Sequence, residues 1–166
     1  MKYKIAIIDY GLGNLFSLQR ALDFLGYQSV VTKNAKEIKD SARLILQGVG
    51  AFDVGMKNLD NNNLIEVLDG CHRSGKPILG ICLGMQLLME TSEEGGINQG
   101  LGFISGSVVR FKSAIKEEDN YKIPQVGWNK IIPKNNKVES WDCTFLSKTP
   151  LDSYFYFVHS YHVQVR

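Results

Sequence analysis

The chain has 166 residues, of which 44% are hydrophobic and 22% charged, so it can bury one core and is expected to be a single domain over 1–166. Lys and Arg number 19 against 17 Asp and Glu, which leaves a formal net charge of +2. No basic cluster is interleaved with aromatic residues. These features argue against a nucleic-acid-binding or membrane-binding protein and favour small molecules and other proteins as partners.

The N-terminal segment and the cysteines narrow the class of protein further. The apolar run Ile5–Ile8 is too short for the core of a signal peptide, and no stretch approaches the roughly 20 apolar residues that a membrane span needs. We therefore expect a cytoplasmic protein. Cys71, Cys82 and Cys143 form no Cys-x-x-Cys pair, which argues against a disulfide framework, a metal site or a thioredoxin-like motif.

The first half of the chain alternates β-branched runs with helical patterns. The pattern predicts strands over 4–9, 27–32, 44–46 and 78–81 and helices over 14–25 and 63–72. In the first helix leucines recur at helical spacing, Asn14 is the expected N-cap and Gly26 the expected stop. Such alternation predicts a flavodoxin-like, three-layer α/β domain with a parallel central sheet, in which ligands collect at the carboxyl ends of the strands.

The second half of the chain is richer in strands. We expect them over 101–111, 126–132, 144–146 and 154–163, as an antiparallel extension with few helical segments between them. The segment 112–122 is rich in Lys and Glu and is expected to be a solvated loop. The sequence stops at Arg166 in an apparent strand, which would leave a sheet neighbour unpaired and predicts that the C-terminal part of the domain is missing.

One cysteine lies where a strand meets a helix. Gly80-Ile81-Cys82-Leu83-Gly84 joins the strand over 78–81 to a helical pattern with Met85, Leu88 and Met89 as its apolar face, which is the layout of a nucleophile elbow. A Cβ on either glycine would collide with backbone in such a strained turn. The N–H groups of the helix would favour the thiolate, and Leu83 N–H would face an oxyanion. On this short pattern alone, a buried and inert cysteine remains the alternative.

Two further glycine turns are expected at the same edge of the sheet. Gly48-Val49-Gly50 follows the strand over 44–46, and its N–H groups could complete an oxyanion hole with Leu83. Viewed alone, it could equally be a strand-to-helix turn that needs unusual dihedrals. The loop 9–16 begins like a dinucleotide fingerprint but has Phe16 where the third glycine is needed, so we expect no nicotinamide or flavin cofactor.

Six segments carry a family resemblance: Asp9–Leu15, Gly48–Phe52, Gly80–Gln86, Gly100–Gly102, Gly127–Asn129 and Phe157–Tyr161. Over the whole chain they resemble the glutaminase subunits of imidazole glycerol phosphate synthase, which are class I, triad-type glutamine amidotransferases. The resemblance implies an enzyme without a cofactor that hydrolyses glutamine to glutamate and ammonia. It also implies a heterodimer, in which ammonia is passed to a cyclase-type (β/α)8-barrel synthase subunit in histidine biosynthesis.

The resemblance also implies a role for individual residues. Cys82 would attack the glutamine carboxamide to form a thioester. The oxyanion donors would be Gly48, Val49, Gly50 and Leu83. Substrate would be bound by Gln86, Ser160 and Tyr161. The partner interface would include Asn14, Trp128 and Asn129. Without the resemblance, Gln86 would be an exposed helix residue and Trp128 a half-buried sheet aromatic.

The sequence departs from this family in its catalytic base. The family carries the triad histidine and acid in a Gln-Phe-His-Pro-Glu motif near its C-terminus, and this chain has no such motif. Loss of a triad base typically costs on the order of a thousandfold in rate. Three explanations remain open: a missing C-terminal part, which we favour, a naturally short pseudo-glutaminase that regulates a synthase, and a base supplied by His159 or His162.

Two smaller departures bear on the turn and the partner. Gln47 stands where the family usually has proline before the Gly-Val-Gly turn, and Gln125 where it usually has histidine after Pro124. The second position touches the expected partner interface. Together the two departures leave open a paralogous amidotransferase subunit that serves the amidation of surface-glycan sugars. A stand-alone cysteine hydrolase of similar core fold is the remaining enzyme alternative.

Overall fold

The computed structural model describes residues 4–111, 122–132, 141 and 144–166. These residues belong to two compact units, one formed by Met1–Arg110 together with Tyr161–Arg166 and the other by Phe111–Ser160. The loop expected over 112–122 lies outside the described residues except for its last position. No helix in the described ranges is long and apolar enough to cross a membrane.

A parallel four-stranded sheet forms the centre of the first unit, with the strand order β2-β1-β3-β4. Its strands are β1 (Ile5–Ile8), β2 (Ser29–Thr32), β3 (Arg43–Gly48) and β4 (Ile78–Cys82). Every position of β1 is buried, as expected for a strand covered on both faces. Gly48, the last residue of β3, pairs in register with Cys82, the last residue of β4. The parallel central sheet predicted from the sequence is therefore confirmed.

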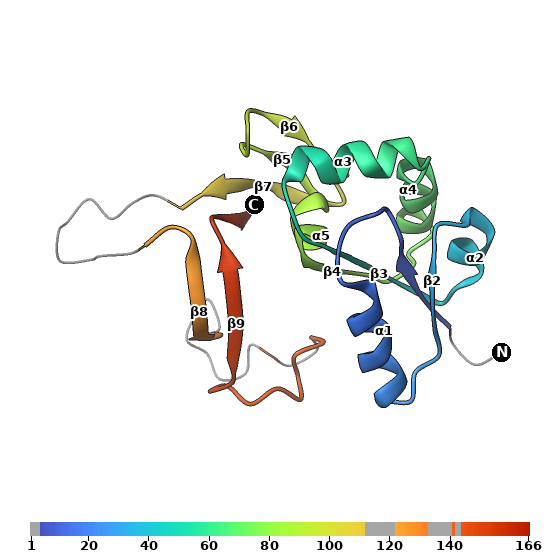
Figure 1. The fold of residues 1–166 in the computed structure, drawn as a ribbon, viewed down its shortest axis with the longest axis horizontal. Coiled ribbons are helices and arrows are strands. Elements are labelled where there is room, and N and C mark those ends of the chain that lie inside the picture. The colour runs from blue at the N-terminus through green and yellow to red at the C-terminus, as the bar shows by residue number, and fades with distance from the viewer. Residues whose placement is uncertain (1–3, 112–121, 133–140, 142–143) are drawn as a thin grey trace. The chain divides into compact units, whose positions relative to one another are not determined.

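Five helices flank this sheet in the described residues. They are α1 (Leu15–Phe24), α2 (Ala35–Asp40), α3 (Phe52–Asn61), α4 (Ile65–Arg73) and α5 (Leu83–Leu87). Figure 1 shows α1 on one side of the sheet and α3 and α4 on the other. Asn14 caps α1 by accepting a hydrogen bond from Ser17 N–H at 3.2 Å, and Gly26 follows the helix with a φ of 77°, both as predicted. The helices α2 and α3 were not predicted.

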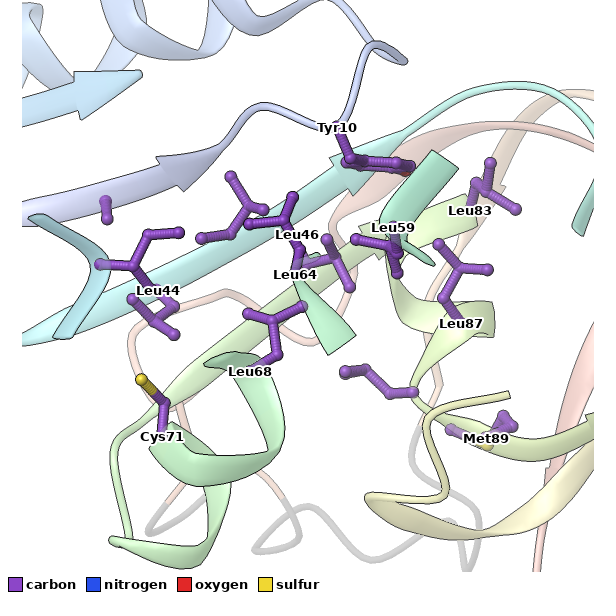
Figure 2. Close-up of a cluster of buried hydrophobic side chains, with 14 of the residues drawn as sticks. Tyr10, Leu44, Leu46, Leu59, Leu64, Leu68, Cys71, Leu83, Leu87 and Met89 are labelled. Carbon is purple, nitrogen blue, oxygen red and sulfur yellow. The ribbon is translucent and has the colours of Figure 1, made fainter. Parts of the chain in front are cut away.

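The main core lies between the sheet and the helices α3, α4 and α5 (Figure 2). Alternate strand residues point into this core, since side chains of a strand alternate between its two faces. The strands contribute Ala6, Ile8, Leu44 and Leu46, and the helices contribute Leu59, Leu68, Cys71, Leu83 and Leu87. Each fully buried leucine stabilises the fold by about 1.5–3 kcal/mol. This packing holds α5, the helix that follows Cys82, against the sheet.

The first unit also contains a mixed sheet with the strand order β10-β7-β5-β6. Its strands are β5 (Met89–Ser92), β6 (Asn98–Gln99), β7 (Ile104–Arg110) and β10 (Tyr161–Val165). β5 and β6 are antiparallel, as are β7 and β10, whereas β5 and β7 are parallel.

The apolar face predicted for the helix after Cys82 is wrong at two positions. Met89 begins β5 instead of belonging to the helix, and Met85 is 38% exposed. Leu83 and Leu87 form the buried face of α5 instead.

The second unit contains the antiparallel pair β8 (Gln125–Lys130) and β9 (Tyr154–His159). The single strand predicted over 154–163 is wrong, because the chain bends at Ser160 and its continuation pairs with β7 as β10. The strand predicted over 144–146 is also wrong, since these residues form turns. Thr144 Oγ1 accepts a hydrogen bond from Leu146 N–H at 3.1 Å, and such local side-chain bonds compete with strand pairing.

Candidate functional site

Three loops lie close together at the carboxyl edge of the central sheet, following β1, β3 and β4. The paired ends Gly48 and Cys82 bring the loop after β3 beside the turn after β4. A Cβ placed on Gly13, in the loop after β1, would lie 3.3 Å from the Cα of Gly48. In open parallel sheets this edge is where ligands bind. The structure therefore brings the three glycine turns to one place.

Cys82 occupies a strained backbone position between β4 and α5. Its φ of 53° and ψ of −119° lie in a region that L-residues rarely adopt, at a cost of about 1–3 kcal/mol. Asn63 is the other non-glycine residue with positive φ in the described part of the chain. Cys82 is exposed, whereas Cys71 is 4% exposed within the core. A strained turn that presents an accessible sulfur is the geometry of a nucleophile elbow.

The two glycines of the elbow let α5 approach the sheet. A Cβ on Gly80 would lie 2.5 Å from the Cα of Met85, and a Cβ on Gly84 would lie 1.8 Å from the carbonyl oxygen of Leu46. Real Cβ atoms essentially never come within 3.0 Å of such atoms. The Gly-x-Cys-x-Gly spacing is therefore the condition for packing this short helix directly on β3 and β4.

The turn Gly48-Val49-Gly50 presents its backbone beside the cysteine. Val49 is 54% exposed and Gly50 has a φ of 112°. Leu83 is the first residue of α5, so its N–H has no partner within the helix. N–H groups from this turn and from Leu83 are the kind of donors that stabilise a tetrahedral oxyanion. α5 has only five residues, which confines any helix-dipole effect on the sulfur to its first turn.

Tyr10 lies beneath this turn and was assigned no role in the site from the sequence. Its side chain is fully buried, and a Cβ on Gly48 would lie 1.7 Å from its hydroxyl oxygen. That hydroxyl has no hydrogen-bond partner among the described residues. Burial raises the pKa of Tyr10 well above its ordinary value, and the negative charge of the Cys82 thiolate raises it further. Tyr10 is therefore a neutral phenol near Cys82.

Two of the expected substrate-binding residues are in contact. Gln86, half-buried on α5, donates a hydrogen bond from Nε2 to the carbonyl oxygen of Tyr161 at 3.4 Å. Ser160 adjoins Tyr161 at the bend between β9 and β10, and its carbonyl oxygen accepts a hydrogen bond from Phe111 N–H at 3.0 Å. The first contact places Tyr161, which is far from the elbow in sequence, against the helix that begins after Cys82.

The residues expected to face a partner occur in both units. In the first unit, Asn14 is exposed and its side chain caps α1. In the second unit, Asn129 is exposed and Trp128 is 68% exposed, so Trp128 does not have the half-buried position that a sheet aromatic would have without a partner-facing role. Trp128 faces Tyr156 across β8 and β9, with 5.6 Å between ring centroids. Tyr156 belongs to the same exposed aromatic surface and was not identified from the sequence.

The three histidines lie in different surroundings. His72, at the end of α4, stacks on Phe103 with 4.3 Å between ring centroids. His159 lies at the end of β9 and meets the Phe111 ring edge-on, with 4.9 Å between ring centroids. His162 belongs to β10, opposite Val109 on β7. Within the described ranges, no group of three or more His, Cys, Asp or Glu side chains could hold a metal ion.

Comparison with known families gives the class of protein that this fold and elbow represent. The model of the family described as glutamine amidotransferase class-I matches residues 6–166. Two solved structures share the fold, each with a TM-score of 0.60. One is a glutamine amidotransferase (16% identical, 76% of this chain and 62% of that one). The other is a Thermoplasma acidophilum protein assigned to GMP synthase (18% identical, 98% and 67%). The chain belongs to the class I glutamine amidotransferase family.

The more similar relatives narrow this membership to one branch. Subunit HisH 1 of imidazole glycerol phosphate synthase from Legionella pneumophila (strain Lens) is 44% identical, over 95% of this chain and 73% of the relative. The HisH subunits of Sulfurimonas denitrificans (46% identical, 95% and 72%) and of Geobacillus sp. (strain WCH70) (41% identical, 96% and 72%) are similar over the same length. Within the family, the chain therefore groups with the HisH subunits.

Proposed function

We propose that the chain is the glutaminase subunit of imidazole glycerol phosphate synthase and supplies ammonia for histidine biosynthesis. The observation that carries the proposal is Cys82, an exposed thiol at positive φ between β4 and α5. The likeness to HisH subunits from several bacteria supports this pathway over the amidation of surface-glycan sugars. A cysteine hydrolase that acts alone is disfavoured by the same likeness.

In the proposed reaction, the sulfur of Cys82 attacks the carboxamide carbon of glutamine. The tetrahedral intermediate carries an oxyanion, which the N–H groups of the Gly48–Gly50 turn and of Leu83 would stabilise. The C–N bond breaks, the nitrogen takes up a proton and leaves as ammonia, and a glutamyl thioester remains on Cys82. Water then hydrolyses the thioester to glutamate and the free thiol. Gln86 and the segment Ser160–Tyr161 would hold the amino-acid end of the substrate.

The thiol needs a base, and the family's Gln-Phe-His-Pro-Glu motif is absent from these 166 residues. We expect the 166-residue chain by itself to hydrolyse glutamine about a thousandfold or more below the rate of a complete triad. Robust hydrolysis by this chain would instead identify His159 or His162 as the base. A gene product that remains inactive with its synthase bound would be the regulatory pseudo-glutaminase.

The proposed partner is a cyclase-type (β/α)8-barrel synthase subunit. Its docking surface would include Asn14, Trp128 and Asn129, which are all exposed. A large exposed aromatic such as Trp128 is typical of interface residues. Ammonia in neutral water is mostly protonated and not nucleophilic, so release would be productive only when the synthase is docked.

The test uses the gene product that contains this chain, purified together with its synthase subunit. Cys82→Ala is expected to abolish glutamine-dependent synthesis and to leave ammonia-dependent synthesis intact, because only the first needs the thioester. Cys71→Ala, which removes a buried sulfur from α4, is the matched control and should keep glutamine-dependent synthesis. Unchanged glutamine-dependent turnover in the Cys82→Ala complex would exclude Cys82 as the nucleophile.

A further inference from the structure

The helix α3 begins directly after the Gly48–Gly50 turn but lacks a capping side chain of its own. Its N-cap residue is Ala51, which makes no side-chain hydrogen bond although its φ of −82° and ψ of 148° are those of an ordinary N-cap. The first N–H groups of a helix have no partner within it. Ala51 has no side-chain oxygen to accept a hydrogen bond from these groups, as Ser, Thr, Asn or Asp would have.

A carboxylate from a distant part of the chain takes the place of this cap. Phe52 N–H, at the start of α3, donates to Oε2 of Glu94 at 2.9 Å, across 42 positions in sequence. Hydrogen bonds from a backbone N–H to a carboxylate are among the stronger ones in proteins. Glu94 therefore ties the connection between β5 and β6 to the point where the Gly48–Gly50 turn ends.

The backbone of Glu94 is itself held in place. Glu94 N–H donates to Oγ of Ser92 at 3.2 Å, and Ser92 is only 1% exposed. The side chain of Asn98 donates from Nδ2 to the carbonyl oxygen of Glu94 at 2.8 Å. These two bonds hold the backbone of Glu94, from which its carboxylate reaches Phe52 N–H.

The start of α3 is also coupled to the elbow. A Cβ on Gly55, in the first turn of α3, would lie 3.1 Å from both δ-carbons of Leu87 and 3.3 Å from Cδ2 of Leu83. α3 thus packs closely on α5, the helix that begins after Cys82. A shift of the N-terminus of α3 would change the distance between the Gly48–Gly50 turn and the Cys82 sulfur.

We propose that Glu94 is a positioning residue for the oxyanion turn: its carboxylate holds Phe52 N–H and thereby fixes the Gly48–Gly50 backbone relative to Cys82. The expected effect of Glu94 on turnover rests on the proposed glutaminase function. The expected effect of Glu94 on the backbone does not depend on that function, and it is measured separately by hydrogen exchange. The role is distinct from contact with glutamine, because it is exerted through α3.

Three variants in the synthase complex separate these possibilities. Glu94→Ala removes the cap, Glu94→Gln keeps a carbonyl oxygen as acceptor, and Ala51→Ser in the Glu94→Ala background supplies a local cap where the backbone already suits one. Glu66→Ala is the matched control, since Glu66 lies in the first turn of another helix, α4. Hydrogen exchange of residues 47–56, glutamine-dependent turnover and ammonia-dependent turnover are measured for each.

We expect Glu94→Ala to speed exchange in residues 47–56 and to lower glutamine-dependent kcat about tenfold, the factor that about 1.4 kcal/mol represents. KM and ammonia-dependent turnover should change less than about twofold, because the substrate contacts and the synthase are untouched. Glu94→Gln should recover most of the kcat. The Ala51→Ser/Glu94→Ala variant should recover both exchange protection and kcat, and Glu66→Ala should alter neither.

Two outcomes would overturn the proposal. Unchanged exchange in Glu94→Ala would mean that the carboxylate does not hold the turn. Recovered exchange without recovered kcat in the Ala51→Ser/Glu94→Ala variant would mean that Glu94 acts on the substrate directly. A failure of the proposed function is recognised separately, because Cys82→Ala would then keep glutamine-dependent turnover while the exchange measurement still reports on Glu94.

Discussion

Gly84→Ala is the most severe small substitution that the elbow offers, and Gly70→Ala is its matched control. Both glycines lie in helices, in α5 and α4, and neither has a positive φ. A Cβ on Gly84 would lie 1.8 Å from the carbonyl oxygen of Leu46, whereas a Cβ on Gly70 would have nothing within 4 Å. The same chemical change therefore meets backbone at one site and open space at the other.

The magnitude follows from the distance. Ordinary van der Waals contact begins at 3.4 Å, so the alanine Cβ would lie 1.6 Å (3.4 − 1.8) too close to the carbonyl oxygen of Leu46. The helix α5 must therefore move away from β3 by about that much. Overpacking of this kind costs about 1–3 kcal/mol or more, which lowers the Tm by roughly 2–12 °C for a chain of this size. Gly70→Ala should instead raise stability by about 0.4–1 kcal/mol, because alanine favours the helix and restricts the unfolded chain.

Thermal unfolding followed by circular dichroism measures the stability difference, and the rate of alkylation by iodoacetamide measures access to Cys82. Gly84→Ala should change the alkylation rate, since the helix that begins after Cys82 has moved, and Gly70→Ala should not. Equal Tm values for the two variants would refute the argument that close approach of α5 to β3 requires glycine at position 84.

Three further predictions concern single groups. Tyr10→Phe should raise the free energy of unfolding by about 1 kcal/mol, because it removes a buried hydroxyl without a partner. Burial raises the pKa of Tyr10, so above pH 10 the tyrosine ionises in the unfolded chain but not in the folded one. The stability advantage of Tyr10→Phe should therefore grow above pH 10. Chemical unfolding of both proteins at pH 8 and at pH 10.5 tests the advantage and its growth. Cys82→Gly should be about 1 kcal/mol more stable than Cys82→Ala, because glycine relieves the strain at a φ of 53°, and equal midpoints in urea would contradict this. The Lys130 ammonium, by its hydrogen bond at 2.8 Å and then by its charge, holds the pKa of Asp152 below the ordinary 3.8. The contribution of this pair to stability is therefore present above pH 3.8 and lost as the pH falls through the lowered pKa. In Lys130→Met, the pKa of Asp152 measured by NMR should rise toward the ordinary 3.8.

Local signals were enough to predict the central sheet and the first helix. Runs of β-branched residues marked β1 and β2, and Asn14 and Gly26 marked the two ends of α1. These signals work because each depends on residues only a few positions apart. The spacing of Gly80 and Gly84 around Cys82 likewise identified the elbow, since it reflects a steric requirement of that segment.

The remaining features depend on residues that are distant in sequence. α3 was missed because its N-cap is Ala51 and its capping carboxylate, Glu94, comes 42 positions after Phe52. The break at Ser160 was missed because the continuation of β9 finds its partner in β7, about 50 residues earlier. The burial of Tyr10 beneath Gly48 follows from packing between β1 and β3, which no local pattern contains.

The in-register pairing of Gly48 with Cys82 makes the alignment of two strands part of the site. Side chains of a strand alternate between its faces, so a slip of one residue between β3 and β4 would turn the cysteine away from the Gly48–Gly50 turn. A single insertion or deletion within either strand would therefore separate the Cys82 sulfur from the N–H groups of the Gly48–Gly50 turn while leaving every residue of both motifs present.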